Sequence, residues 1–140
     1  PRNIKKALLI IDVMCRNVSG TLNVNTINLE HIYPQNPNYE WAKNGWPSHR
    51  DNQKKLIDNI GNYLLLSEIV NKSIQNQYIT DKKVKYEYII SKDNILQTPM
   101  NTVDFNKFES NREKYIYERQ NNMVELIKKN LPLGKVLIKD

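Results

Sequence analysis

The sequence predicts an α+β domain in which a two-stranded antiparallel hairpin and a following helix, the ββα arrangement, pack among flanking α-helices. Two apolar segments, at residues 27–32 and 63–66, have the length and composition of strands. Apolar residues also recur at helical spacing over about 4–18 and 104–130. A chain of 140 residues can bury one hydrophobic core, so we expect a single domain over residues 1–140.

The first helix is predicted over residues 4–18, where residues such as Leu8 and Ile11 lie on one face of a helical cylinder. The other faces carry basic and polar residues, which indicates an amphipathic helix that packs on a partner surface. The first strand, at 27–32, alternates between apolar and polar residues. Pro34 is expected to end the extended segment, because proline has no backbone N–H for a ladder hydrogen bond.

The connection between the two strands, residues 35–58, shows no periodicity and is interrupted by proline and glycine. We expect a long but ordered excursion, because the connection contains Trp41 and other aromatic residues. Ile60-Gly61-Asn62 is a turn signal before the second strand. After that strand, Ser67 is a predicted N-cap for a helix over residues 68–77.

Two further helices are predicted. One follows Thr80 and covers residues 81–90. The other is a single long helix, capped by Asp104 and ending near residue 130. Its apolar side includes Phe105, Phe108, Ile116, Met123 and Ile127.

Composition excludes several classes of protein. Cys15 is the only cysteine, so the chain has no internal disulfide framework and no cysteine-based structural zinc site. No apolar run is long enough to span a bilayer and no secretory signal is present, so we expect no membrane association and a cytoplasmic protein. The net charge of +6 weakly favours a polyanionic partner. Because the chain begins at Pro1, inside an apparent helix, we expect a domain cut from a longer protein.

Residues with hydrolytic chemistry occur at defined places in this predicted arrangement. They form the pattern Glu30-His31-Ile32-x-Pro34-Gln35, then Gly61-Asn62-x-Leu64-x-Leu66, then Asn71, Asn76, Lys82-Lys83 and Tyr86. This pattern resembles the C-terminal nuclease domain of Gmr-type, modification-dependent restriction endonucleases, which belongs to the HNH or ββα-metal nucleases. The resemblance covers about residues 25–90, and Arg119 lies near the position of an arginine in that family.

The resemblance implies a role for each residue of the pattern. His31 is the expected general base, Glu30 and Asn71 the expected ligands of one Mg²⁺ or Mn²⁺, and Asn62 the residue that braces the loop beneath the histidine. The chemistry agrees, because a neutral imidazole accepts a proton from water, and carboxylate and amide oxygens are hard ligands. The expected DNA contacts are Lys72, Asn76, Lys82 and Lys83, for which a solvated helix surface is the simpler alternative.

The pattern departs from the commonest HNH motif in its first residue, a Glu in place of Asp, and in its third, an Asn in place of His. The resemblance also sets a geometric requirement. Neighbouring residues on a regular strand point to opposite faces, so we expect the strand to end, twist or bulge at Glu30 and His31. Each residue alone is weak support for a nuclease site. Asn71, for example, is one of 20 asparagines in the sequence.

We therefore predict a metal-dependent DNA endonuclease domain that acts in defence against modified foreign DNA. The resemblance further implies an NTP-hydrolysing, modification-sensing domain before it in the full protein, and it is compatible with a homodimer. Two alternatives remain open at this stage. One is a nucleic-acid-binding module that does not cleave, and the other is a ribonuclease or toxin-like effector that uses the same residues.

Overall fold

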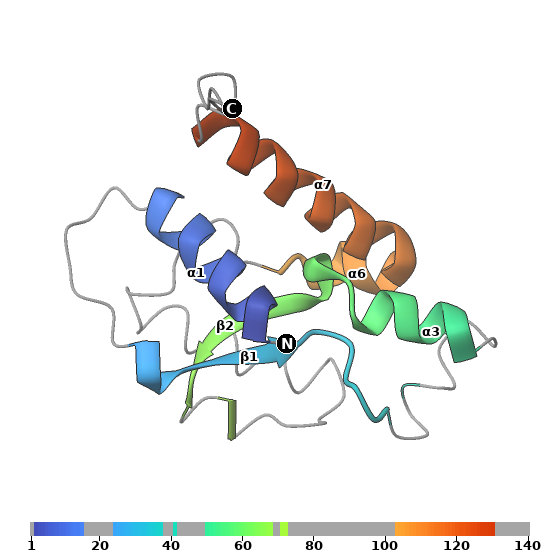
Figure 1. Ribbon diagram of the computed structural model, residues 1–140. Coiled ribbons are helices and arrows are strands. Elements are labelled where there is room, and N and C mark those ends of the chain that lie inside the picture. Colours follow the sequence, from blue (N-terminus) through green and yellow to red (C-terminus); the bar gives the residue numbers. More distant parts are fainter. Residues whose placement is uncertain are drawn as a thin grey trace, which may run out of the picture.

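The computed structural model describes residues 2–15, 24–37, 41, 50–68, 71–72 and 103–130. Within them the protein has the predicted α+β architecture (Figure 1). Helix α1 (Arg2–Cys15) packs on β2 of the hairpin and on the long helix α7 (Arg112–Asn130). None of the described helices combines the length and the apolar character that crossing a bilayer would require.

The hairpin consists of β1 (Ile27–His31) and β2 (Tyr63–Ser67), paired antiparallel with Ile27 opposite Ser67 and His31 opposite Tyr63. Both predicted strands are thus confirmed. A short 3₁₀ turn, η1 (Val24–Thr26), precedes β1. Helical residues begin directly after β2 at Glu68, as predicted, and the described part of that segment is compatible with a ββα arrangement.

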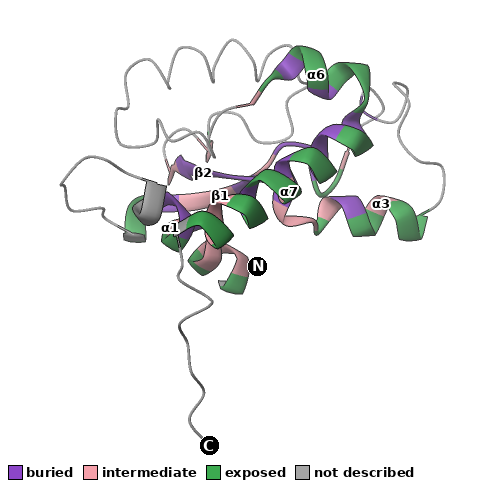
Figure 2. Cartoon of the chain, turned by 90° about the horizontal axis from the view of Figure 1, so that it is seen from above, coloured by how far each residue is buried: buried purple, intermediate pink, exposed green. Residues whose placement is uncertain are grey.

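Both faces of β2 are buried, and this explains why the second strand is an unbroken apolar run. Successive side chains of β2 enter two separate hydrophobic clusters. Tyr63 and Leu65 pack with Leu8 and Ile11 of α1 and with Met123 of α7. On the other face, Leu64 and Leu66 pack with a cluster that contains Trp41, Leu56, Phe108 and Ile116. Figure 2 shows the buried residues along β2 and along one side of α7.

One helix lies where the sequence predicted an aperiodic connection. Helix α3 (Arg50–Ile57) precedes the second strand. It is followed, after two residues, by the 3₁₀ turn η2 (Ile60–Asn62), which is the predicted turn. In α3 only Leu56 is buried, so the helix has no apolar stripe that could have revealed it. The prediction for residues 35–58 was wrong at this point, although the expected ordering of Trp41 is confirmed by its complete burial.

The final helix is divided in two, which corrects the prediction of a single helix. Helix α6 (Phe105–Ser110) ends at Asn111, whose backbone is extended with φ −159° and ψ 93°, and α7 follows. Asp104 caps α6 as predicted, because its side chain accepts a hydrogen bond from the backbone N–H of Lys107. The apolar spacing continues across the break and therefore did not predict it.

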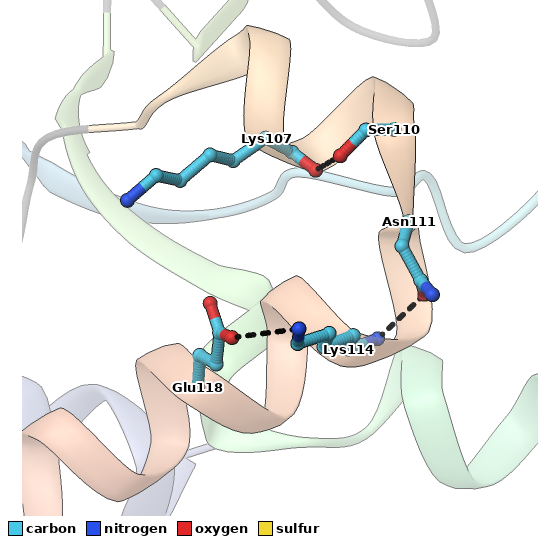
Figure 3. A network of polar contacts seen from close by, with 5 residues as sticks. All are labelled: Lys107, Ser110, Asn111, Lys114 and Glu118. Atoms are coloured by element: carbon cyan, nitrogen blue, oxygen red, sulfur yellow. Dashed lines mark hydrogen bonds and ion pairs between the residues drawn. The ribbon is translucent and has the colours of Figure 1, made fainter.

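Local hydrogen bonds at Ser110 and Asn111 account for the break (Figure 3). The Ser110 hydroxyl donates to the Lys107 carbonyl, with a distance of 2.8 Å between the oxygens. The Asn111 side-chain oxygen accepts from the backbone N–H of Lys114 at 3.0 Å, which makes Asn111 the N-cap of α7. Serine and asparagine compete with the helical hydrogen-bond ladder in this way, so the pair ends one helix and begins the next.

Helix α1 begins two residues earlier than predicted, at Arg2, and is described as far as Cys15. The remaining residues of the predicted helix 4–18 lie outside the described residues, as does the predicted helix 81–90.

Candidate active site at the outer edge of β1

Glu30 and His31 both lie within the regular part of β1, opposite Leu64 and Tyr63 respectively. β1 ends at His31, yet the ladder continues in the same register for one more residue, because Ile32 N donates to the Asn62 carbonyl at 2.9 Å. Since side chains alternate along a strand, Glu30 shares the face of Leu64 and His31 shares the face of Tyr63. β1 thus ends at the pair, which is one of the expected forms of interruption, and the chain bends directly after it, at Ile32 and Tyr33.

The hydrogen bond from Ile32 to Asn62 also determines which backbone groups face outward. In an antiparallel ladder, hydrogen-bonded and non-hydrogen-bonded pairs alternate, so Glu30 bonds across to Leu64. The backbone N–H and C=O groups of Leu29 and His31 then point away from β2, toward the outer edge of β1. The two candidate residues therefore flank an edge of the described two-stranded sheet.

Asn71 lies at this same edge. Its side-chain nitrogen Nδ2 donates to the carbonyl oxygen of Leu29 at 3.3 Å, and this carbonyl belongs to the peptide that joins Leu29 to Glu30. The structure thus brings together Asn71 and Glu30, which are 41 positions apart in the sequence. The Glu30 side chain is largely buried, with 7% of the residue exposed.

Asn62 is completely buried, and its amide binds backbone groups on both sides. Its Oδ1 accepts from Tyr33 N at 2.9 Å, and its Nδ2 donates to the carbonyls of Tyr33 and Ile57, each at 3.1 Å. Tyr33 lies two residues after His31, so Asn62 ties the segment that follows β1 to the end of α3. These bonds orient the chain beside His31 and leave Asn62 no contact with a substrate.

Helix α7 holds the turn that carries Asn62. The guanidinium of Arg119 donates to the carbonyl of Gly61 through Nε at 2.8 Å and to the carbonyl of Tyr63 through Nη2 at 3.0 Å. Gly61 lies so close to α7 that a Cβ atom would overlap the backbone carbonyl of Ile116. Sequence reasoning noted Arg119 only through the family resemblance. A usable signal existed, because Arg119 lies on the apolar stripe of α7 between Ile116 and Met123.

The imidazole of His31 lies against the ring of Tyr63, with 4.4 Å between the ring centroids and 47° between their planes. Burial raises the pKa of the Tyr63 phenol above its ordinary value of 10.0, and the negative charge of Asp58 adds to this effect. Sequence reasoning treated Tyr63 only as a core strand residue, since the register that sets it opposite His31 cannot be read from the sequence.

Lys72, a predicted DNA contact next to Asn71, forms an exposed ion pair with Glu68 at 2.5 Å. The hydrogen bond from Lys72, followed by its positive charge, lowers the pKa of the Glu68 carboxyl. The other predicted DNA contacts, Asn76, Lys82 and Lys83, lie outside the described residues.

Among the described residues, no group of three or more His, Cys, Asp or Glu side chains could hold a metal ion. Glu30 and Asn71 would offer a different donor set, one carboxylate oxygen and one amide oxygen. Mg²⁺ commonly takes only one or two protein ligands and keeps waters in its other positions. A carboxylate oxygen and an amide oxygen are therefore donors of the kind that such an ion accepts.

Two hollows on the described surface lie elsewhere. The first, of about 210 Å³, is at the junction of α6 and α7 and is lined by Lys107, Ser110, Asn111, Lys114, Tyr115 and Glu118. The second, of about 470 Å³, is open and is lined by Asp51, Lys54, Lys55 and Asp58 of the α3 region. Neither is lined by Glu30, His31 or Asn71.

Comparison with known proteins gives one match. A family model described as "GmrSD restriction endonucleases, C-terminal domain" matches residues 4–126. No curated protein and no solved structure matches the chain significantly. The matched range contains β1, β2 and most of α7, and with them Glu30, His31, Asn62 and Asn71.

Proposed function

Because the chain belongs to the family of GmrSD restriction endonuclease C-terminal domains, we propose that it is a metal-dependent DNA endonuclease domain that hydrolyses phosphodiester bonds in defence against modified foreign DNA. One observation carries the assignment of its site. The Asn71 amide bonds to the peptide that precedes Glu30, which supports the proposal that Asn71 and Glu30 act at one site beside His31. We further propose that modification sensing and NTP hydrolysis belong to another domain of the larger enzyme.

The scissile phosphate is proposed to bind along the outer edge of β1, beside Leu29 and His31. This position answers the difficulty that Glu30 and His31 point to opposite faces of the strand. A group in the middle of either face would meet only one of the two side chains. A group at the edge can be approached by one side chain from each face, and Asn71 already lies there.

The residues of the chain have distinct tasks in this proposal. Glu30 and Asn71 hold the divalent ion, Mg²⁺ or Mn²⁺, through hard oxygen ligands. When bound, such an ion supplies positive charge that stabilises the phosphorane-like transition state and the departing 3′ oxygen. His31 takes the proton of the attacking water as general base. Asn62 contributes by orienting the backbone after His31, through its two bonds to Tyr33.

Lys72 is proposed to bind a DNA phosphate beside the site. Its ammonium is exposed and, within the described part of the chain, pairs with Glu68 four residues earlier. An exposed i,i+4 pair of this kind contributes little to stability, so a phosphate can replace the carboxylate at small cost. Such a contact would position the DNA without reading its sequence.

The decisive experiment is cleavage of supercoiled plasmid in Mg²⁺ or Mn²⁺ by the wild type and by His31→Ala. We expect nicking to disappear in His31→Ala while circular dichroism shows an intact fold. Asn36→Ala is the matched control, because Asn36 is exposed five residues further along the same segment and lies outside the motif. Full activity in His31→Ala would overturn the assignment of the base.

Calorimetry tests the metal ligands separately. Asn71→Ala removes the amide oxygen and should weaken Mn²⁺ binding about tenfold or more, as losses around metal sites commonly do. Asn71→Asp keeps an oxygen ligand and should retain binding. Equal affinity in wild type and Asn71→Ala would remove Asn71 from the site. The same preparation assayed on RNA distinguishes a ribonuclease from a DNA endonuclease, and salt-dependent DNA binding without cleavage would indicate a binding module.

A further inference from the structure

His31 and Tyr63 are direct cross-strand partners, and their rings touch. The alternation of the ladder makes them a non-hydrogen-bonded pair, because the neighbouring pair of Ile32 and Asn62 is the hydrogen-bonded one. In such pairs the Cα atoms approach to about 4.5 Å and the side chains on the shared face are closest. The separation of 4.4 Å between the two ring centroids agrees with this geometry.

Tyr63 is itself held firmly. Its backbone N–H donates to the Ile60 carbonyl, and its carbonyl accepts from the Arg119 guanidinium. Only 3% of the residue is exposed, and it packs in the cluster that contains Leu8 and Leu65. The ring is therefore a fixed surface, while His31, at the last position of β1, is only partly buried.

We infer that Tyr63 is the residue that positions His31, by holding one face of the imidazole so that the base meets the attacking water in a single orientation. This inference rests on the proposed function, since it takes His31 to be the base. Tyr63 acts through His31 and not on the substrate. Its removal should therefore slow the chemical step without changing the affinity for DNA or metal.

Two variants separate the ring from the hydroxyl and from simple bulk. Tyr63→Phe keeps the ring, and Tyr63→Leu keeps an apolar side chain but loses the flat surface. In single-turnover cleavage of plasmid we expect Tyr63→Phe to remain within about twofold of wild type. We expect Tyr63→Leu to lose about tenfold to a hundredfold in rate, the range that a small misplacement of a reacting group produces. DNA and Mn²⁺ affinities should stay unchanged in both.

An NMR measurement on the wild type tests the contact between His31 and Tyr63 directly, without relying on the activity of a variant. The sequence contains two histidines, so His31→Ala identifies the ring proton signals of His31 in an NMR spectrum of the full chain. Contact with the Tyr63 ring should displace these signals from their positions in unfolded protein, and the displacement should persist in Tyr63→Phe and vanish in Tyr63→Leu.

Undisplaced His31 signals in the wild type would overturn the inference, as would full cleavage activity in a folded Tyr63→Leu. A loss in Tyr63→Phe as large as in Tyr63→Leu would also overturn it, because the ring would then not be the feature that matters. Failure of the proposed function has a different signature. In that case His31→Ala cleaves normally, whereas the ring contact is still seen by NMR.

Discussion

Replacing Asn62 by alanine tests the link between the buried amide and the candidate site most directly. The substitution removes three hydrogen bonds and leaves the N–H of Tyr33 and the carbonyls of Tyr33 and Ile57 without their partner. Each buried hydrogen bond contributes about 1 kcal/mol net, so we expect a loss of about 3 kcal/mol in the free energy of unfolding. Domains of this size unfold with about 5–15 kcal/mol, so Asn62→Ala should remain folded at 25 °C.

Thermal and urea unfolding measure this loss. A destabilisation of about 3 kcal/mol should lower the melting temperature by about 10 °C in a chain of this length. Asn52→Ala is the matched control, because Asn52 is exposed on α3, and it should change stability by less than about 0.5 kcal/mol. Cleavage by folded Asn62→Ala should fall about a hundredfold, since the segment beside His31 loses its attachment.

Asn62→Asp sharpens the same test. It keeps an oxygen for Tyr33 N but turns a carboxylate toward the carbonyls that Nδ2 now contacts. At neutral pH it should therefore be at least as destabilised as Asn62→Ala. A loss below about 1 kcal/mol in Asn62→Ala, or a stable Asn62→Asp, would refute the reasoning that this amide holds the two backbone segments together.

Four further substitutions have defined outcomes. Gly61→Ala forces a Cβ atom against the Ile116 carbonyl. It should lower the free energy of unfolding, measured in urea, by about 3 kcal/mol, the upper range for overpacking. Unchanged stability would contradict the close packing of η2 against α7. Asn111→Ala removes the N-cap of α7 and should cost about 1 kcal/mol, which Asn111→Asp should largely avoid. Lys72→Ala should reduce the slope of the logarithm of the DNA-binding constant against the logarithm of salt concentration by about 1, while the affinity for Mn²⁺ stays the same. An unreduced slope would exclude a phosphate contact by Lys72. Burial raises the pKa of Tyr33 well above its ordinary value of 10.0, so the folded protein keeps this phenol protonated at pH values where the unfolded protein loses the proton. The stabilising contribution of Tyr33 is therefore complete below pH 10 and decreases as the pH rises from 10 toward the folded-state value. The unfolding free energy should fall over that range, less steeply in Tyr33→Phe, and equal slopes in both proteins would contradict this.

The hairpin and helix α1 were predictable because each has a strong local pattern. The run from Leu64 to Leu66 reads as a buried strand, and Leu8 and Ile11 indicate the inner face of a helix. Helix α3 was missed because it buries Leu56 alone, and a helix with one buried residue leaves no periodic signal. The break at Asn111 was missed for the opposite reason, since the apolar spacing of α6 and α7 continues without interruption across it.

The candidate site residues come from the sequence alone, whereas their geometry could not be predicted from it. Glu30, His31, Asn62 and Asn71 follow from motif and resemblance. Motif spacing contains no information on strand register, so the contact of His31 with Tyr63 could not be foreseen. The expected end of the strand is present, but Glu30 and His31 still point to opposite faces, because the bend at Ile32 and Tyr33 comes only after the pair. A strand edge can be approached by side chains from both faces, and the motif alone does not indicate that arrangement.

The contacts that define the site all join segments far apart in the chain. Tyr33 and Asn62 are separated by 29 residues, Leu29 and Asn71 by 42, and Gly61 and Arg119 by 58. No local element can form the site by itself, because each of these bonds closes a long loop and needs the packed core to hold it. The Arg119 bonds are made by α7, so that helix is as much a requirement of the site as the strand that carries His31. A chain ending before α7 would keep every residue of the motif, lose the bonds to the Gly61 and Tyr63 carbonyls, and is therefore expected to have no cleavage activity.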